Sequence, residues 1–291
     1  MEENVGVINR EELADSTAKV QQPVRKTRRN SWLRILVTAS IFYILLLLAL
    51  ALTGNSNLFP TLVMVGNFMV PVAYVSFLYE RRQLSRLTMP TVSLAFLYGG
   101  LIGILAASFL GPFFITSQTS IGAVLRIGLI EEFAKILGVV VIARRRRHDA
   151  EMDGLILGAA VGMGFAALES TGYAFTAFLE SNGSLSVTVA VTLFRGLLSP
   201  LGHGTWTAIL ASVLFRESSN CCFRVNLQVI GAYLFVSVLH AFWNLLPLAL
   251  TPTDPGISTL ITQGLVGVVG LWVLGRRWRE AIKQQNNLIF N

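Results

Sequence analysis

Residues 130–135 read IEEFAK, two glutamates and a lysine inside an apolar run that extends from about residue 121 to 143. A run of about 20 apolar residues is long enough to cross a bilayer as a helix. A charged side chain at the bilayer centre costs roughly 2.5 to 3.5 kcal/mol, so these groups must face protein or water rather than lipid. The stretch therefore predicts a membrane helix in a bundle, with its ionisable face turned inward.

The composition extends this reading to the whole chain. Hydrophobic residues make up 53% of the 291 residues and charged residues only 13%, which is too apolar for a soluble protein. Eight apolar stretches are long enough to span a bilayer, at about 33–53, 58–79, 91–110, 121–143, 154–179, 187–215, 226–249 and 257–275. We expect an all-α fold, a polytopic membrane helix bundle of about eight transmembrane helices in the plasma membrane.

The basic residues of the connections fall on one side of this bundle. They precede span one and follow spans two, four, six and eight: Arg25, Lys26, Arg28, Arg29, Arg81, Arg82, Arg86, Arg144 to Arg147, Arg216, Arg224, Arg276, Arg277, Arg279 and Lys283. The other loops, GNSN, GPFFITSQTS, ESNGSLS and TPTDPGIS, contain neither lysine nor arginine. Because lysine and arginine collect in cytoplasmic loops, both termini are expected in the cytoplasm. This topology accounts for the net charge of +7, and we expect no nucleic-acid partner.

The chain divides into three parts. Residues 1–30 are polar and mixed in charge, which predicts a disordered cytoplasmic tail. Residues 31–280 form one transmembrane domain, and residues 281–291 a second cytoplasmic tail.

Span four carries the densest group of ionisable residues. Lys135 lies four residues after Glu131 and three after Glu132, so either carboxylate can pair with it. The two glutamates are about 100° apart around the helix, which lets the other one face a cavity. The i+4 spacing favours Glu131 as the partner of Lys135 and leaves Glu132 as the favoured base. Two carboxylates this close resist ionising together, which suits one of them to exchange a proton. Arg126, near the end of the span, is expected to extend to the interface.

Spans five to seven add further polar groups. These are Glu169 on the face of Gly154, Gly158 and Gly162, then Arg195, Ser199 and His203 around Pro200, and then His240 and Asn244 one turn apart. At about 1.5 Å per residue, Glu131, Glu132, Glu169 and His240 lie about 14 to 15 Å from the outer surface. His203 would lie near 24 Å in a straight helix, so we expect Pro200 to break the span.

Carboxylates and neutral imidazoles in a partly dry cavity can act as a general base for water and as hydrogen-bond donors to an oxyanion. These are the groups that amide hydrolysis requires. A serine mechanism is disfavoured because Ser199, one turn from His203, lacks an orienting acid. A proton- or ion-coupled transporter is the alternative, since buried acids, lysine and histidine also relay protons. It predicts inverted repeats with matching broken helices, and spans one to three contain no such break. A structural protein ranks third, because buried ion pairs stabilise poorly.

Four motifs occur in order on consecutive spans: EEFAK (131–135), FAALE (165–169), RGLLSPLGH (195–203) and HAFWN (240–244). In this the chain resembles the PrsW family of intramembrane proteases and is distantly similar to CAAX prenyl endopeptidases of the ABI group. The resemblance makes 31–280 a protease domain with catalytic spans at about 121–249. It implies regulated proteolysis, in which the partner is a membrane-anchored protein substrate, in bacteria typically an anti-sigma factor.

The resemblance also implies roles for the residues that match the motifs. Glu131 or Glu132 would activate water, and Glu169 and His203 would complete its binding. His240 and Asn244 would stabilise the oxyanion, while Lys135 and Arg195 would balance charge. The residue after the motif glutamate is often asparagine in the family and is Ser170 here.

The cofactor prediction follows from span four. EEFAK is not an H-E-x-x-H zinc motif, and its helix places no histidine beside the acids. Lys135 also disfavours a cation at this position. We therefore favour a metal-free glutamate mechanism without a cofactor, and keep a divalent metal such as zinc as the alternative, because glutamate and histidine are zinc ligands.

Overall fold

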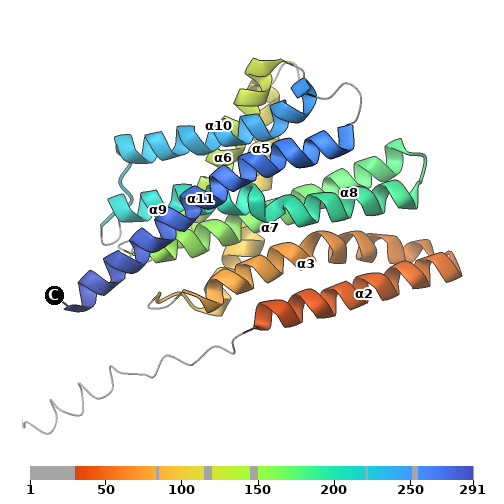
Figure 1. Ribbon diagram of the computed structural model, residues 1–291, viewed down its shortest axis with the longest axis horizontal. Coiled ribbons are helices and arrows are strands. Elements are labelled where there is room, and N and C mark those ends of the chain that lie inside the picture. Colours follow the sequence, from red (N-terminus) through yellow and green to blue (C-terminus); the bar gives the residue numbers. More distant parts are fainter. Residues whose placement is uncertain are drawn as a thin grey trace, which may run out of the picture.

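The computed structural model describes residues 30–82, 85–114, 120–144, 150–219, 222–250 and 255–290. They form a bundle of helices (Figure 1). The elements are α2 (Ser31–Thr53), η1 (Ser56–Leu58), α3 (Phe59–Glu80), α4 (Met89–Leu94), η2 (Ala95–Gly99), α5 (Gly100–Phe114), α6 (Ile121–Ala143), α7 (Glu151–Glu180), α8 (Leu185–Leu198), η3 (Ser199–Leu201), α9 (His203–Glu217), α10 (Leu227–Leu250) and α11 (Pro255–Phe290). Each predicted stretch corresponds to one helical segment, so the all-α polytopic fold is confirmed. Residues 1–29 of the predicted tail lie outside the described ranges.

Seven helical segments among these residues are long and apolar enough to cross a bilayer. They are Ser31–Thr53, Ser56–Glu80, Met89–Phe114, Glu151–Glu180, Leu185–Glu217, Leu227–Pro247 and Thr259–Asn286. The remaining long segment, α6, has 23 residues but carries Arg126, Glu131, Glu132 and Lys135. Its two inward-facing groups, Glu132 and Lys135, are fully buried, so the rest of the bundle shields these two side chains from lipid.

Helix α7 lies at the centre of the bundle and packs most extensively on α9 (Figure 1). The contact follows the glycine stripe of α7: a Cβ at Gly154, Gly158 or Gly162 would strike the backbone of α9. Glycine is therefore required for the close approach of the two helices. At Gly162 the atom that would be struck is the carbonyl oxygen of His203, so the stripe brings His203 against α7.

Two further glycines hold α6 against its neighbours. A Cβ on Gly128 would lie 2.6 Å from the carbonyl oxygen of Ser237 on α10, and one on Gly138 would lie 2.5 Å from that of Gly99 in η2. Helix α6 is thus held between α10 and η2, with Lys135 against His203 of α9 and Glu132 against His240 of α10.

The sixth span is broken at Pro200, as predicted from the sequence. Helix α8 ends at Leu198, η3 follows, and α9 begins at His203. Proline cannot continue the helical hydrogen bonding, and the hydroxyl of Thr205 donates to the freed carbonyl oxygen of Pro200 at 2.6 Å. The break places His203 at the start of a new helix and removes the conflict in depth that a straight span would create.

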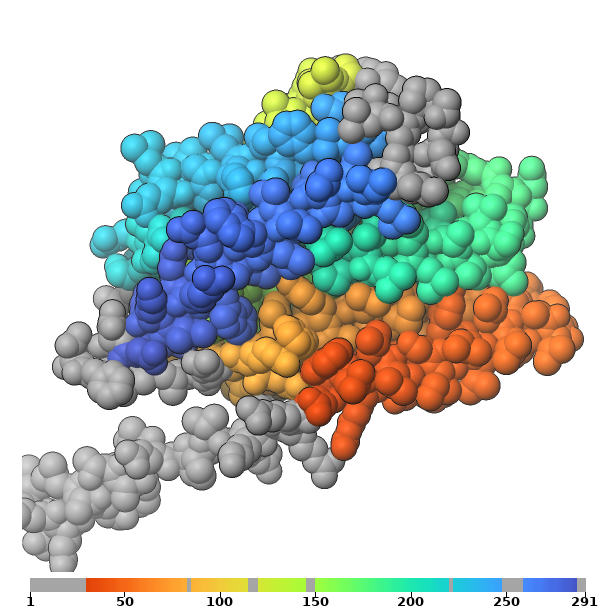
Figure 2. Space-filling model, in the orientation of Figure 1, coloured from red at the N-terminus to blue at the C-terminus, as the bar shows by residue number. Residues whose placement is uncertain are grey.

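Helix α11 covers this break. It lies across α9 and beside α10, as Figure 2 shows for this face. Gly267 packs on Leu201 of η3, and Gly270 on Thr205 and Trp206 of α9. The helix continues to Phe290, well beyond the predicted end of the span at 275, so the predicted tail 281–291 is helical as far as Phe290.

Candidate active site

The four motifs converge between α6, α7, α9 and α10, and Arg195 joins them from α8. Lys135 is the central residue. Its Nζ donates to Oε1 of Glu132 at 2.7 Å and lies 2.7 Å from Nδ1 of His203. Oε2 of Glu131 is further away, at 3.6 Å. The i+4 preference for Glu131 was therefore wrong: Glu132 is the partner of Lys135, because the lysine side chain turns toward His203.

Glu132 is enclosed on every side. Its side chain has no exposed surface, and Oε1 lies 2.9 Å from Nδ1 of His240 in addition to the lysine contact. The histidine is also buried, at 2% exposure. Glu132 therefore serves as a fixed partner for a cation and an imidazole, which argues against the role of base that its spacing suggested.

Glu131 has a different environment. Its side chain is 16% exposed, but its Oε2 is buried and has no hydrogen-bond partner among the described residues. The nearest polar atoms are Nε2 of His240 and Nζ of Lys135, both at 3.6 Å, which is beyond hydrogen-bond distance. Oε2 of Glu132 also lacks a partner within the described ranges, but that side chain is sealed. Of the two adjacent glutamates, Glu131 is thus the one whose side chain reaches the surface.

A second ion pair lies on the other side of His203. Arg195 Nη2 donates to Oε2 of Glu169 at 2.7 Å, and Nε2 of His203 lies 3.2 Å from the same oxygen. Arg195 Nε also donates to the hydroxyl of Ser170 at 3.2 Å, and its guanidinium lies over the ring of Tyr173. Ser170 therefore accepts a hydrogen bond that orients Arg195.

Three other residues considered in the sequence analysis lie outside the hydrogen-bonded cluster. Asn244 lies one turn beyond His240 and is half-buried, but the structure gives it no hydrogen bond to any residue that it describes. Ser199 donates to the carbonyl oxygen of Gly196 at 2.8 Å, so its hydroxyl serves the helix end rather than a nucleophile. Arg126 is exposed and donates to the carbonyl oxygens of Gly122 and Phe114, away from the cluster as expected.

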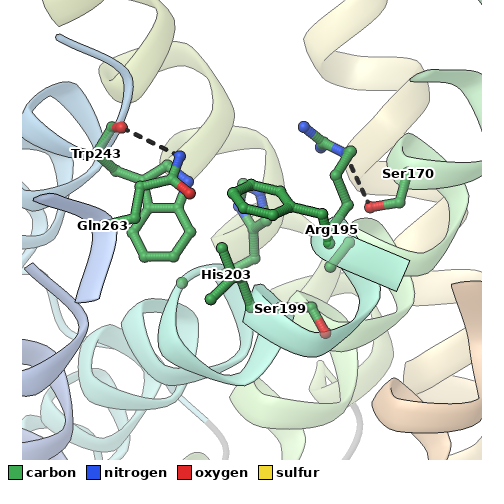
Figure 3. A pocket seen from close by; sticks show the side chains of 10 residues that line it. Ser170, Arg195, Ser199, His203, Trp243 and Gln263 are labelled. Atoms are coloured by element: carbon green, nitrogen blue, oxygen red, sulfur yellow. Dashed lines mark hydrogen bonds between the residues drawn. The ribbon is translucent and has the colours of Figure 1, made fainter. Parts of the chain in front are cut away.

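A cavity opens beside His203 (Figure 3). It is lined by Ala166, Ser170, Phe194, Arg195, Leu198, Ser199, Gly202, His203, Trp243 and Gln263. The space for water-sized molecules is about 40 Å³, and one water needs roughly 10 to 15 Å³ on this measure. The cavity therefore has room for a few waters, and a substrate peptide enters it only if the surrounding helices separate.

Three side chains around the site were not singled out in the sequence. The ring of Phe165 lies 4.4 Å from Nζ of Lys135, and Trp206 packs on both His203 and His240. Gln263 of α11 donates weakly to the carbonyl oxygen of Trp243 at 3.4 Å, while its buried Oε1 has no partner in the described part of the chain. Gln263 is a polar residue within an apolar span, and that signal could have marked it.

The site also has the donors that a metal ion requires. Glu131, His203 and His240 each offer one ligand atom, and these atoms lie within 4.8 Å of one another. Zinc is held by such a set of one carboxylate and two imidazoles in several hydrolases. The unpartnered Oε2 of Glu131 is a buried acceptor of the kind that a cation satisfies. The donor types and spacing therefore fit a divalent metal, and the two histidines reach Glu131 from other helices, although its own helix supplies none.

Comparison with known proteins gives one match. Residues 88–274 match the family described as PrsW family intramembrane metalloprotease. No curated protein and no solved structure matches the chain. The matched region begins just before α4 and ends in α11, so it contains every residue of the site described above. The chain therefore belongs to the PrsW family of intramembrane metalloproteases and is a multi-pass membrane peptidase.

Proposed function

We propose that this peptidase hydrolyses a peptide bond of a membrane-anchored protein, such as an anti-sigma factor, with a water molecule activated by Glu131. The observation that carries the proposal is the contrast between the two adjacent glutamates. Glu132 is sealed and bound to Lys135 and His240, whereas Glu131 is partly exposed and its Oε2 has no partner within the described ranges.

In this mechanism Glu131 accepts a proton from the water as it attacks the scissile carbonyl carbon, and later returns a proton to the leaving amine. The Lys135–Glu132 pair and the Arg195–Glu169 pair keep fixed charges beside the reaction. Fixed charges in a site of restricted water stabilise developing charge without reorganising. Glu169 and Arg195 thus orient groups around the cavity, and neither is placed to attack the substrate.

A divalent metal is part of this proposal as an alternative to the metal-free mechanism. Glu131 and the two histidines are the residues that could hold it. When bound, such an ion would supply Lewis-acid polarisation of the water or of the carbonyl oxygen. The family's description as metalloproteases supports this version.

The placement of the substrate follows from the cavity of Figure 3. It lies beside His203 and is lined by Arg195 and Gln263. The free Oε1 of Gln263 is an acceptor that an N–H of the substrate backbone can satisfy. We propose that the surrounding helices separate when the substrate enters, and that it then lies here as an extended segment, with its scissile carbonyl between His203 and Glu131.

We also propose a plasma-membrane location with both termini in the cytoplasm. The segregation of arginine and lysine to alternate connections supports this orientation. Accessibility of single cysteines introduced in the GNSN and ESNGSLS loops to an impermeant reagent in intact cells tests it. Labelling of neither loop in intact cells, with labelling after lysis, would reverse the orientation.

The activity is tested with purified protein in liposomes and a panel of labelled single-pass membrane proteins. Loss of a general base lowers rates by roughly 10² to 10⁴-fold, so we expect that loss in Glu131→Gln. Arg126→Gln, which also changes an ionisable residue of α6, is the matched control and should retain activity. Chelator treatment and Zn²⁺ restoration decide between the two versions of the mechanism. Full cleavage by Glu131→Gln would overturn the assignment of the base.

A further inference from the structure

The contacts of the two histidines assign them opposite hydrogen-bonding states. Nδ1 of His203 lies 2.7 Å from Nζ of Lys135, and lysine has only donors. Nδ1 of His203 must therefore be an acceptor. Its Nε2, 3.2 Å from Oε2 of Glu169, then carries the proton and faces the carboxylate as a donor.

His240 has the reverse arrangement. Its Nδ1 lies 2.9 Å from Oε1 of Glu132, and this oxygen also accepts from Lys135 at 2.7 Å. The ion pair identifies the Glu132 carboxylate as an acceptor, so Nδ1 of His240 carries the proton. A carboxylate that holds one ring nitrogen of a histidine in this way directs the lone pair of the other nitrogen toward a metal or a proton. In His240 that lone pair is on Nε2.

The lone pair of His240 points at another acceptor. Nε2 lies 3.6 Å from Oε2 of Glu131, the oxygen without a hydrogen-bond partner among the described residues. Two acceptors that face each other at this distance repel unless a water hydrogen or a cation lies between them. For comparison, two ligands of one tetrahedral zinc ion at about 2.0 to 2.1 Å would be roughly 3.3 Å apart.

We propose that Lys135 and Glu132 act as positioning residues that fix opposite tautomers in the two histidines and so give them different roles. The lone pair on Nε2 of His240 is left beside Glu131 for the nucleophilic water or a divalent metal, whereas the single N–H of His203 is held by Glu169. This deepens the proposed function and rests on it. It also moves His240 from the oxyanion role that the family resemblance implied to the side of the water.

Exposure supports the same division. His203 lines the cavity of Figure 3, whereas His240 is not among the residues that line it and is 2% exposed. His203 thus faces the cavity, and His240 faces Glu131 inside the cluster. With its proton on Nε2 and Lys135 against Nδ1, His203 has no free lone pair in this arrangement, so of the three candidate ligands Glu131 and His240 stay available to a metal.

The test is the protonation site of each ring nitrogen, observed by long-range ¹H–¹⁵N correlation in chelator-treated, ¹⁵N-histidine-labelled protein. The chain has three histidines, and His148→Gln and His240→Gln assign the signals. We expect the proton of His203 on Nε2 and that of His240 on Nδ1. A proton on the other ring nitrogen of either histidine overturns the proposal. The tautomers are read in the wild-type protein, and the two variants serve only to assign its signals.

Variants test the part played by Lys135. In Lys135→Met/Glu132→Gln, which removes the pair without leaving one buried charge, the Nδ1 signal of His203 should move toward that of an unbonded acceptor nitrogen. It should stay in place in Arg126→Met, which removes a cation from the same helix. An unmoved signal in the folded double variant rejects the positioning role.

Zn²⁺ alone, added to labelled protein, tests the division between the histidines. The signals of His240 should shift, and those of His203 should not. His240→Gln should weaken Zn²⁺ binding by roughly 10-fold or more, while His203→Gln, whose amide also donates, should retain it. Zn²⁺ bound through His203 contradicts the inference. These measurements need no cleavage, so absent proteolysis with the expected histidine states would count against the proposed function alone.

Discussion

The close approach of α6 and α10 at Gly128 should be required for catalysis. A Cβ at this position would lie 2.6 Å from the carbonyl oxygen of Ser237 and 3.4 Å from Cβ of His240. Ordinary van der Waals contact of a Cβ begins at 3.4 Å, so Gly128→Ala must move the backbone of α10 by about 0.8 Å. The displaced segment carries His240, whose contacts with Glu131 and Glu132 then lengthen.

A misplacement of about 1 Å can lower an enzyme's rate by roughly 10²-fold, so we expect Gly128→Ala to cleave roughly 30- to 100-fold more slowly. The assay is cleavage of the single-pass protein that the wild-type chain cuts in liposomes, with thermal unfolding measured in parallel. Gly122→Ala on α6 and Gly231→Ala on α10 are matched controls, because a Cβ there meets only the tip of Arg126 or open space. Wild-type cleavage by folded Gly128→Ala would refute the argument that this contact positions His240.

Three further predictions concern the surroundings of the site. Arg195→Met should lower the rate while Arg126→Met does not, because only Arg195 holds Glu169; equal rates would remove Arg195 from the site. Gln263→Leu should raise the KM for the cleaved protein and leave kcat nearly unchanged, because its free Oε1 faces the cavity; a fall in kcat alone would contradict this role. Lys135→Met should destabilise the fold by about 3 to 5 kcal/mol, because it leaves Glu132 buried and unpaired, and Lys135→Met/Glu132→Gln should recover part of that loss in thermal unfolding; no recovery would show that the ion pair is not its source.

Much of the fold could be predicted from the sequence because membrane spans follow from length and hydrophobicity alone. The apolar stretches and the Pro200 break became helices and a helix break at the predicted positions. The end of α11 was missed, since its continuation to Phe290 is polar and no rule of membrane insertion governs it. The bilayer fixes where spans begin and end, and it has no influence on helices outside it.

The gathering of the charged residues and histidines into one cluster could also be predicted, because charged groups in a membrane must face one another, although Gln263 was missed. Their pairing could not. The i+4 rule favoured Glu131 for Lys135, but that rule describes an isolated helix. In the bundle, His203 from α9 and His240 from α10 lie on the side of Glu132 and draw the lysine to it. Pairing depended on residues 68 and 105 positions further along the chain, and no local spacing contains that information.

Charge balance gives a separate reason to place the chemistry at Glu131. Three carboxylates, Glu131, Glu132 and Glu169, face two cations, Lys135 and Arg195, in one cluster. With both histidines neutral, one negative charge is left over. Lys135 is closest to Glu132 and Arg195 is bound to Glu169, so the uncompensated charge belongs to Glu131. An unbalanced charge in an interior of low dielectric attracts a proton or a cation strongly. A proton or a cation bound at Glu131 would compensate the excess negative charge of the cluster. The same charge imbalance therefore supports Glu131 as the general base in a metal-free enzyme and as a ligand in a metal-bound one.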